Sequence, residues 1–241
     1  MSDTNHFDTD VAATYDDDHS DAEVKDVVDV LFGLSDGGAA VEFAIGTGRI
    51  ALPLAARGCR VAGIELSEAM VQQLRAKETT VPMDVVVGDM TSARVAGDFS
   101  LVFLVFNTID NLLTQDQQVA CFHNAAAHLK PGGCFVIETL VPPLQRLPHG
   151  ETLLAFANGP DHMGTDEFDV VTQNYASHHT RRRGDVLCHN SVPFRYAWPA
   201  EFDLMARLAG LTLESRWAGW DKAPFTNTST SHVSVWRKAS S

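Results

Sequence analysis

Val41-Glu42-Phe43-Ala44-Ile45-Gly46-Thr47-Gly48 decides the fold of this chain, together with Glu65, seventeen positions further on. Residues 40–43 are predicted to form a buried strand, residues 44–48 a tight turn with few side chains, and residues 50–56 the beginning of a helix. Such a turn lets a ligand approach free backbone N–H groups and the N-terminus of the helix. An acid at the end of the next strand can accept hydrogen bonds from both hydroxyls of a ribose. The order of strand, glycine turn, helix, strand and acid therefore predicts a nucleoside-binding half of an α/β fold.

The glycines of this turn fit two kinds of cofactor. Residues 46–51, Gly-Thr-Gly-Arg-Ile-Ala, match the pattern G-x-G-x-x-G/A of dinucleotide-binding enzymes. The stretch also matches the pattern acid-x-G-x-G-x-G, with Glu42 as the acid and Gly46 and Gly48 as two of the glycines. At these residues the chain resembles the class I S-adenosylmethionine (SAM)-dependent methyltransferases. Ala44 stands in the place of the first glycine, and its extra methyl group is compatible with the turn if its φ angle is negative.

The resemblance extends over about residues 35–140, where further blocks follow in the family's order and spacing. Residues 63–67, Gly-Ile-Glu-Leu-Ser, resemble the block whose acid holds the ribose, and residues 87–90, Val-Gly-Asp-Met, resemble the block whose acid takes the adenine amino group. Residues 129–133, Leu-Lys-Pro-Gly-Gly, resemble the family's turn into its fifth strand, here residues 134–138. A dinucleotide enzyme needs neither the acid after the third strand nor this turn, so the methyltransferase is the favoured interpretation.

The resemblance implies a set of residues that bind SAM. Glu65 would accept hydrogen bonds from the ribose hydroxyls, Asp89 would take the adenine N6 amino group, and Met90 would pack on the adenine ring, with ordinary core packing as its alternative. Tyr15 matches the family's N-terminal tyrosine, which closes over the cofactor. Arg49 is a candidate partner for the SAM carboxylate, and an arginine on a helix surface is the equal alternative. The expected set is Tyr15, Glu42, Ala44, Gly46, Gly48, Glu65, Leu66, Asp89, Met90 and Phe106.

The alternation of strand and helix signals predicts the fold class. We expect an α/β fold with a doubly wound, mostly parallel seven-stranded sheet, helices on both faces and an antiparallel β insertion after strand five. The continuously apolar residues 101–106 are typical of a central strand buried on both faces. The expected parts are an acidic arm and helix at 1–38, a SAM-binding core at 39–140, a cap for the substrate at 141–196, and a return to the core at 197–241.

Local signals predict where several helices begin and end. Helical spacing of valines and a leucine predicts an amphipathic helix over residues 21–32. Ser67 is a plausible N-cap, and Thr114 with Gln117 has the pattern of a capping box. Residues 199–209 are predicted to form a helix that is terminated by Gly210.

The charge and composition of the chain exclude several classes of binding partner. The formal net charge is −13, and the first thirty residues hold ten acidic residues and one lysine. This charge repels nucleic acids and anionic membranes. No apolar run approaches the roughly 18 residues of a membrane span, the N-terminus has no secretion signal, and the four cysteines lack metal-binding spacing. We therefore expect a cytoplasmic protein that binds a small-molecule methyl acceptor and neither nucleic acid nor membrane; the oligomeric state is not predicted.

The chemistry of methyl transfer requires few catalytic side chains. Because SAM supplies the electrophile, the protein mainly aligns the nucleophile, and a base is needed only for an acceptor that is protonated at neutral pH. Asn107, Thr108 and Asp110 follow strand four, where the family places substrate and methyl-donor contacts. Helix or turn capping is the alternative role for Asn107 and Thr108. His178 and His179 are candidate bases in the insertion, and as neighbours on a strand they face opposite sides. Each histidine is also compatible with a structural role. No paired acids follow strand five, so no metal site is expected.

These observations predict an enzyme that moves a methyl group from SAM to an O or N atom of a small molecule by in-line displacement. Two alternatives stay open. A NAD(P)-dependent oxidoreductase would bind its cofactor through the same glycine turn. A SAM-binding protein without transferase activity would keep the same acids and show no turnover.

Overall fold

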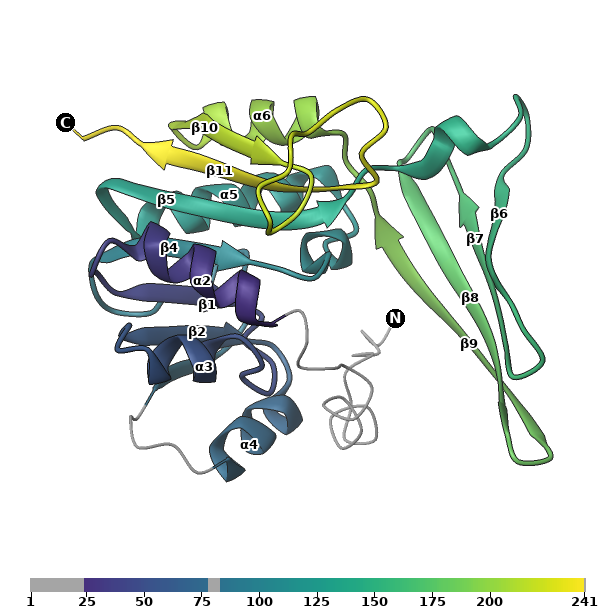
Figure 1. The fold of residues 1–241 in the computed structure, drawn as a ribbon, viewed down its shortest axis with the longest axis horizontal. Coiled ribbons are helices and arrows are strands. Elements are labelled where there is room, and N and C mark those ends of the chain that lie inside the picture. The colour runs from purple at the N-terminus through teal and green to yellow at the C-terminus, as the bar shows by residue number, and fades with distance from the viewer. Residues whose placement is uncertain (1–23, 78–82, 241) are drawn as a thin grey trace.

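The computed structural model describes residues 24–77 and 83–240, and its main part is a seven-stranded sheet in the order β10-β11-β5-β4-β1-β2-β3 (Figure 1). Strands β3, β2, β1, β4 and β5 pair in parallel, and β11 runs antiparallel between β5 and β10. The strands are β1 Ala40–Phe43, β2 Val61–Glu65, β3 Asp84–Val87, β4 Phe99–Leu104, β5 Leu129–Leu140, β10 Leu211–Trp217 and β11 Ser231–Lys238. The strand order reverses between β1 and β4, so the ends of these two strands form the crevice in which doubly wound proteins bind ligands.

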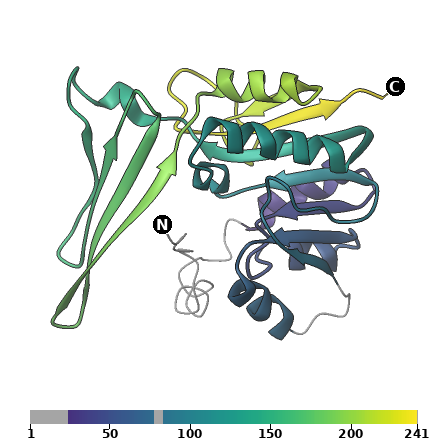
Figure 2. The ribbon, with the colours of Figure 1, turned by 180° about the vertical axis from the view of Figure 1, so that it is seen from behind.

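Helices cover both faces of the main sheet, as predicted. Two buried apolar clusters lie on its opposite faces because side chains alternate along each strand. One cluster packs against α2, α3 and α4, and the other packs against α5 and α6; α2 and α3 lie in front in Figure 1, and α5 and α6 in Figure 2. In β4, Leu101 and Phe103 belong to the first cluster and Val102 and Leu104 to the second. The helices are α2 Val24–Ser35, α3 Ala51–Ala56, α4 Glu68–Ala76, α5 Gln115–His128 and α6 Pro199–Leu208, with the 3₁₀ turns η2 Thr108–Asn111 and η3 Pro143–Arg146.

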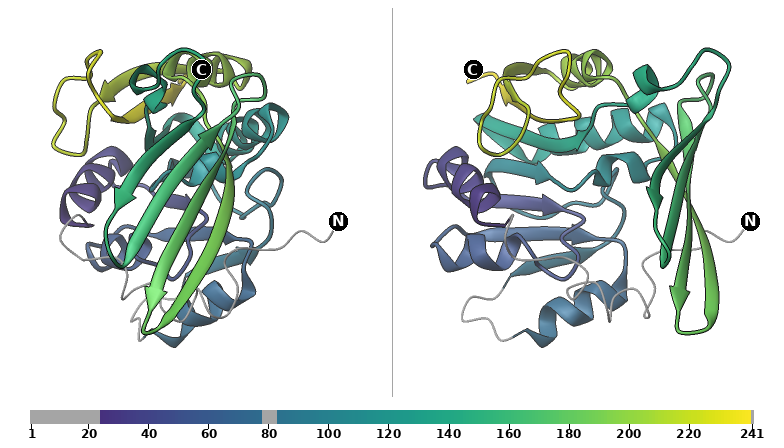
Figure 3. Two further views of the ribbon diagram at one scale, coloured as in Figure 1. Left: turned by 90° about the vertical axis from the view of Figure 1, so that its right-hand side faces the viewer. Right: turned by 45° about the vertical axis from the view of Figure 1, so that its right-hand side comes forward.

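The predicted antiparallel insertion after β5 is a four-stranded sheet in the order β6-β7-β8-β9. Its strands are β6 Leu153–Asn158, β7 His162–Phe168, β8 Asn174–Arg183 and β9 Val186–Arg195. Figures 1 and 3 show this sheet standing on the side of the molecule toward which β4 and β5 point. The insertion therefore faces the edge of the main sheet at which the motif residues gather.

The local predictions hold at the helix N-termini. Ser67 caps α4, where its side chain accepts a hydrogen bond from the Met70 backbone N–H. Thr114 and Gln117 form the capping box of α5. The first helix continues to Ser35, beyond the expected end, while residues 21–23 lie outside the described ranges.

Two strand predictions were wrong at their ends. The central strand is Phe99–Leu104, not residues 101–106, because the backbone turns at Phe106. The Lys-Pro-Gly-Gly segment lies within β5 rather than before it. There the pairing partner changes from Leu129 opposite Phe99 to Cys134 opposite Leu101, so the segment is an irregularity that opens the parallel pairing.

Candidate cofactor and acceptor site

The glycine turn after β1 combines three residues with positive φ. The φ angles are 54° for Ala44, 56° for Gly46 and 84° for Gly48. The expectation of a negative φ at Ala44 was wrong: the turn keeps its left-handed shape, and an alanine adopts it at a cost of roughly 1–2 kcal/mol. Ala44 therefore occupies the glycine position of the motif with the same backbone geometry.

The two glycines of the turn serve different purposes. Among the described residues, the nearest atom to a Cβ built on Gly46 would be the Ala44 carbonyl oxygen, 3.9 Å away, so these residues leave the space above Gly46 open. A Cβ on Gly48 would lie 2.3 Å from Leu74 Cδ1. Gly48 thus allows α4 to pack closely on the turn, and Gly46 leaves room for a ligand at the backbone.

Glu65, at the end of β2, holds the turn in place. One carboxylate oxygen, Oε2, accepts the Gly46 backbone N–H at 2.9 Å, and Oε1 accepts the Ser67 backbone N–H at 2.8 Å. Burial raises the pKa of Glu65, against the lowering effect of these N–H groups. Each oxygen has a second lone pair, so the carboxylate can brace the turn and still accept hydrogen bonds from a diol.

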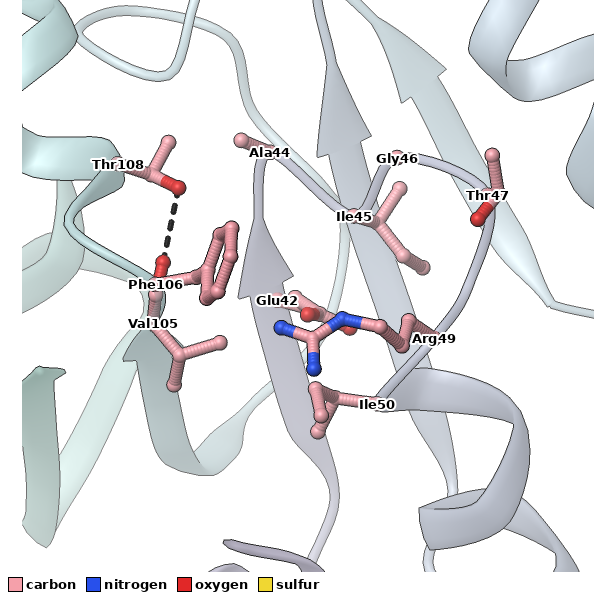
Figure 4. A pocket seen from close by; sticks show the side chains of 10 residues that line it. All are labelled: Glu42, Ala44, Ile45, Gly46, Thr47, Arg49, Ile50, Val105, Phe106 and Thr108. Atoms are coloured by element: carbon pink, nitrogen blue, oxygen red, sulfur yellow. Dashed lines mark hydrogen bonds between the residues drawn. The ribbon is translucent and has the colours of Figure 1, made fainter. Parts of the chain in front are cut away.

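Glu42 forms the floor of a pocket between the turn and the end of β4 (Figure 4). Its Oε2 is buried and has no hydrogen-bond partner among the described residues. Burial raises the pKa of Glu42 well above its usual value, and the charge of Arg49 acts in the opposite direction. The pocket holds about 30 Å³, roughly the volume of one water molecule in the liquid, so it can accept one end of a ligand. Its lining residues are Glu42, Ala44, Ile45, Gly46, Thr47, Arg49, Ile50, Val105, Phe106 and Thr108.

Phe106 and Asn107 follow β4 in a left-handed conformation, with φ angles of 61° and 57°. Glu138, at the end of β5, accepts the Phe106 backbone N–H at 2.9 Å through its side chain and the Asn107 backbone N–H at 3.2 Å through its carbonyl. The other oxygen of the Glu138 carboxylate accepts the Trp220 indole N–H at 2.8 Å. The Arg49 guanidinium lies 4.7 Å from the centre of the Phe106 ring. Two strained residues are thus held at the strand end, which is typical of a functional site.

The residues expected at the adenine end lie beyond β2 and β3, next to Glu65. Asp89 is exposed and its Oδ1 accepts the Thr91 backbone N–H at 2.7 Å. Met90 is partly buried against the core, which agrees with the packing alternative and leaves part of its surface accessible. Leu66 is 62% exposed. These three side chains border the same edge as the glycine turn, whereas Tyr15 lies outside the described residues.

The two neighbouring histidines of β8 face opposite sides, as predicted. His179 bonds the His162 ring, with 3.0 Å between Nδ1 and Nε2, and its Nε2 lies 3.2 Å from Ser177 Oγ. His178 instead bonds Glu167 at 3.3 Å and Ser191 at 2.9 Å. Burial, followed by neighbouring positive charges, lowers the pKa of His179.

Tyr175 shows which face of the insertion sheet turns toward the main sheet. It lies four positions before His179, on the same face of β8, and its hydroxyl reaches Asp110 Oδ2 on η2 at 3.5 Å. His179 is therefore on the face toward the motif residues, and His178 is on the other face. Among the remaining histidines of the insertion, His149 and His189 are exposed.

Tyr175 is absent from the expected site residues, whereas Asp110 was expected among the residues that follow strand four. Asp110 is 2% exposed, and its Oδ1 accepts the Thr139 hydroxyl at 3.2 Å. Burial raises the pKa of Asp110 to about 7. The position of Asp110 after the central strand indicated this residue in the sequence, but no local pattern identifies Tyr175 as its partner, because 65 positions separate them.

The described residues contain neither a candidate metal-binding cluster nor a candidate membrane-spanning helix. Within the described ranges, no group of three or more His, Cys, Asp or Glu side chains is placed to hold a metal ion. None of the helices in those ranges is both long and apolar enough to cross a membrane.

Known methyltransferases are similar to this chain in sequence and in fold. The family model described as a methyltransferase domain matches residues 40–133. The solved structure of the CcbJ methyltransferase from Streptomyces caelestis is 34% identical, has a TM-score of 0.83, and covers 95% of this chain and 96% of its own. The cypemycin N-terminal methyltransferase of a Streptomyces species is 27% identical over 194 residues, 79% of each chain. The dTDP-3-amino-3,4,6-trideoxy-alpha-D-glucopyranose N,N-dimethyltransferase of Streptomyces venezuelae is 30% identical over 118 residues, 48% of this chain and 49% of its own.

Proposed function

This chain belongs to the SAM-dependent methyltransferases, and we propose that the atom it methylates is an amine nitrogen of a small molecule. Family membership decides between the two cofactors that the glycine pattern allowed: the cofactor is SAM, and the protein is an enzyme with a small-molecule acceptor. The remaining question is the chemistry of the acceptor.

The residues at the strand ends fit SAM. Glu42 Oε2 is buried and has no partner within residues 24–77 and 83–240, so it is suited to a cationic group, and the amino group of the methionine portion supplies one. The open space above Gly46 admits the ligand to the backbone, and the free lone pairs of Glu65 suit the ribose hydroxyls. Asp89 would then take the adenine amino group, with Leu66 and Met90 beside the ring. When bound there, SAM supplies an electrophilic methyl group on a sulfonium.

The likeness to the cypemycin N-terminal methyltransferase carries the proposal of a nitrogen acceptor. It extends over 79% of the chain, and that relative's name places the methyl group on an amino terminus. The name of the Streptomyces venezuelae relative likewise describes methylation of an amine, on a nucleotide-linked sugar. The two names describe acceptors with different scaffolds, but in both the methylated atom is a nitrogen.

The side chains of this enzyme align the acceptor and exclude water from the reaction. Asn107 lies at the strand end, beside the pocket, where its amide can orient the acceptor. His179 lies on the face of the insertion sheet that turns toward the main sheet, with its Nδ1 3.0 Å from His162 Nε2. His178 faces away, so of the two neighbouring histidines His179 is the one we assign to the acceptor.

An acceptor screen tests this function. The purified chain is incubated with SAM and matched series of primary and secondary amines, phenols, alcohols and carboxylates, and release of the demethylated cofactor is measured. We expect turnover with amines. Thermal shifts with SAM and with NADH, run in parallel, report cofactor binding independently of the acceptor. Turnover of phenols or alcohols in the absence of amine turnover would contradict the nitrogen assignment.

A further inference from the structure

The carboxyl group of Asp110 lies in an unusual setting for a charged side chain. It follows the central strand β4, three positions after Asn107, and is 2% exposed. Two hydroxyl groups surround it: Thr139 Oγ1 from β5 at 3.2 Å and Tyr175 Oη from β8 at 3.5 Å. Asp110 is thus the point at which the main sheet and the insertion sheet exchange a polar contact beside the candidate site.

No described lysine or arginine forms an ion pair with Asp110. The nearby charge is Arg195 on β9, whose guanidinium bonds Glu201 on α6 at 2.7 Å and Gln173 at 3.2 Å. A buried carboxylate without a cationic partner is costly to keep ionised. A group of this kind beside a site is a candidate for proton transfer.

Tyr175 links this carboxyl to the face of the insertion sheet that turns toward the main sheet. Its ring stacks between Phe168 at 5.2 Å and Phe194 at 5.1 Å. Tyr175 is partly exposed, whereas Asp110 is buried. Of the two groups, Tyr175 is therefore the one that an acceptor amine can touch.

We propose that Tyr175 and Asp110 deprotonate the acceptor amine, with Tyr175 touching the amine and Asp110 receiving the proton through it. This inference rests on the proposed function. One N–H bond of the ammonium group breaks and its electron pair stays on nitrogen. The proton moves to Tyr175 Oη, while the phenolic proton moves from Tyr175 Oη to Asp110 Oδ2. The products of this step are a neutral amine, an unchanged phenol and a neutral carboxylic acid.

The charges around the pair set the direction of the pH dependence. Asp110 faces Thr139 from β5, Tyr175 from β8 and the Arg195 charge from β9. Burial, followed by the charges of Asp110 and of Asp166 on β7, raises the pKa of Tyr175, so the phenol keeps its proton at neutral pH and transmits a proton without being the final base. Asp110 accepts a proton only when ionised, and its pKa is about 7. Turnover should therefore rise as the pH increases through about 7 and level off above it.

Kinetics of Tyr175→Phe and Asp110→Asn test the pair, with Tyr196→Phe as the matched control. Tyr196 contacts the rings of Phe168 and Tyr175, and among the described residues the Asp110 carboxyl accepts its hydrogen bonds from Thr139 and Tyr175 instead. At pH 7 we expect kcat to fall about 10²–10⁴-fold in both test variants and to change less than about twofold in Tyr196→Phe. The KM for SAM should stay unchanged in all three, and the loss should shrink at pH above 9, where more of the acceptor is a free amine.

The pH profile separates a chemical role from a structural one. Asp110→Asn should lose the rise near pH 7, while Tyr196→Phe keeps it. Wild-type kcat and an unchanged pH profile in Tyr175→Phe would overturn the proposal, and this variant alone decides if Asp110→Asn does not fold. The variants are assayed with whichever acceptor the wild type turns over, so a hydroxyl acceptor would refute the nitrogen assignment while the effect of Tyr175→Phe still decides whether this pair accepts the proton.

Discussion

The strand-end edge of the main sheet and the facing side of the insertion sheet place their polar groups by different means. At the main sheet, Glu42, Gly46 and Glu65 lie within one βαβ unit, and Glu65 binds the backbone of the turn directly at 2.9 Å. At the insertion, Asp110 meets Tyr175 across 65 positions of sequence. The proposed cofactor side therefore depends on the backbone shape of one turn, whereas the proposed acceptor side depends on the register of separate strands.

Gly46→Val should cause the largest loss of SAM affinity among the variants proposed for the cofactor site. The branched side chain would fill the open space above the turn, and we expect SAM affinity to fall at least about 100-fold, or roughly 2.8 kcal/mol. Valine is also strained at positive φ. Gly58→Val is the matched control, because Gly58 has a φ of 92° and open space around it. Calorimetric titration with SAM gives the affinities, and similar losses in both variants would mean that strain, not the ligand space, explains the result.

Glu65→Ala should also lower SAM affinity, but by less than Gly46→Val does. It removes a charged hydrogen-bond acceptor for two hydroxyls, and it also releases the Gly46 and Ser67 N–H groups. We expect the affinities for SAM and for its demethylated product to fall at least about tenfold, or roughly 1.4 kcal/mol. Both ligands carry the ribose, so weakening of one ligand without the other would show that Glu65 is not the ribose acid.

His179→Ala and His178→Ala should distinguish the two faces of the insertion sheet. Loss of the His179 ring from the inward face should raise the KM for the acceptor several-fold to about tenfold, an energy of about 1.4 kcal/mol at most. His178→Ala should leave that KM unchanged, because His178 bonds Glu167 and Ser191 on the other face. SAM affinity should be that of the wild type in both. Equal acceptor KM values for the two variants would refute the assignment of faces.

Ala44→Gly should produce the smallest effect. Glycine adopts the φ of 54° without the side-chain penalty, and the relief of about 1–2 kcal/mol is partly offset by about 0.5–1 kcal/mol of added chain entropy in the unfolded state. We expect the free energy of unfolding to rise by about 0.5–1 kcal/mol, measured by urea denaturation, with little change in SAM affinity. A lower stability would show that the Ala44 methyl group contributes packing that outweighs its strain.

The features that were predictable from sequence depend on interactions between residues that are close together in the chain. The N-cap at Ser67 and the capping box at Thr114 depend on atoms three residues apart, and both are present. The two apolar clusters follow from the alternation of side chains along continuous apolar strands. The ends of β4 were missed because a run of apolar residues does not show where the backbone adopts positive φ, which it does at Phe106.

The sequence by itself predicted the doubly wound sheet from its alternating strand and helix signals, and the glycine turn with Glu65 from spacing within one βαβ unit. It favoured SAM through the blocks at residues 63–67, 87–90 and 129–133, and similarity to known methyltransferases decided the cofactor. The tertiary structure decided which of His178 and His179 faces the main sheet, how Glu138 holds the end of β4, and that Tyr175 meets Asp110. The physical reason is that these contacts arise from strand register and from the packing of one sheet against another. Neither property is encoded at a fixed separation along the chain.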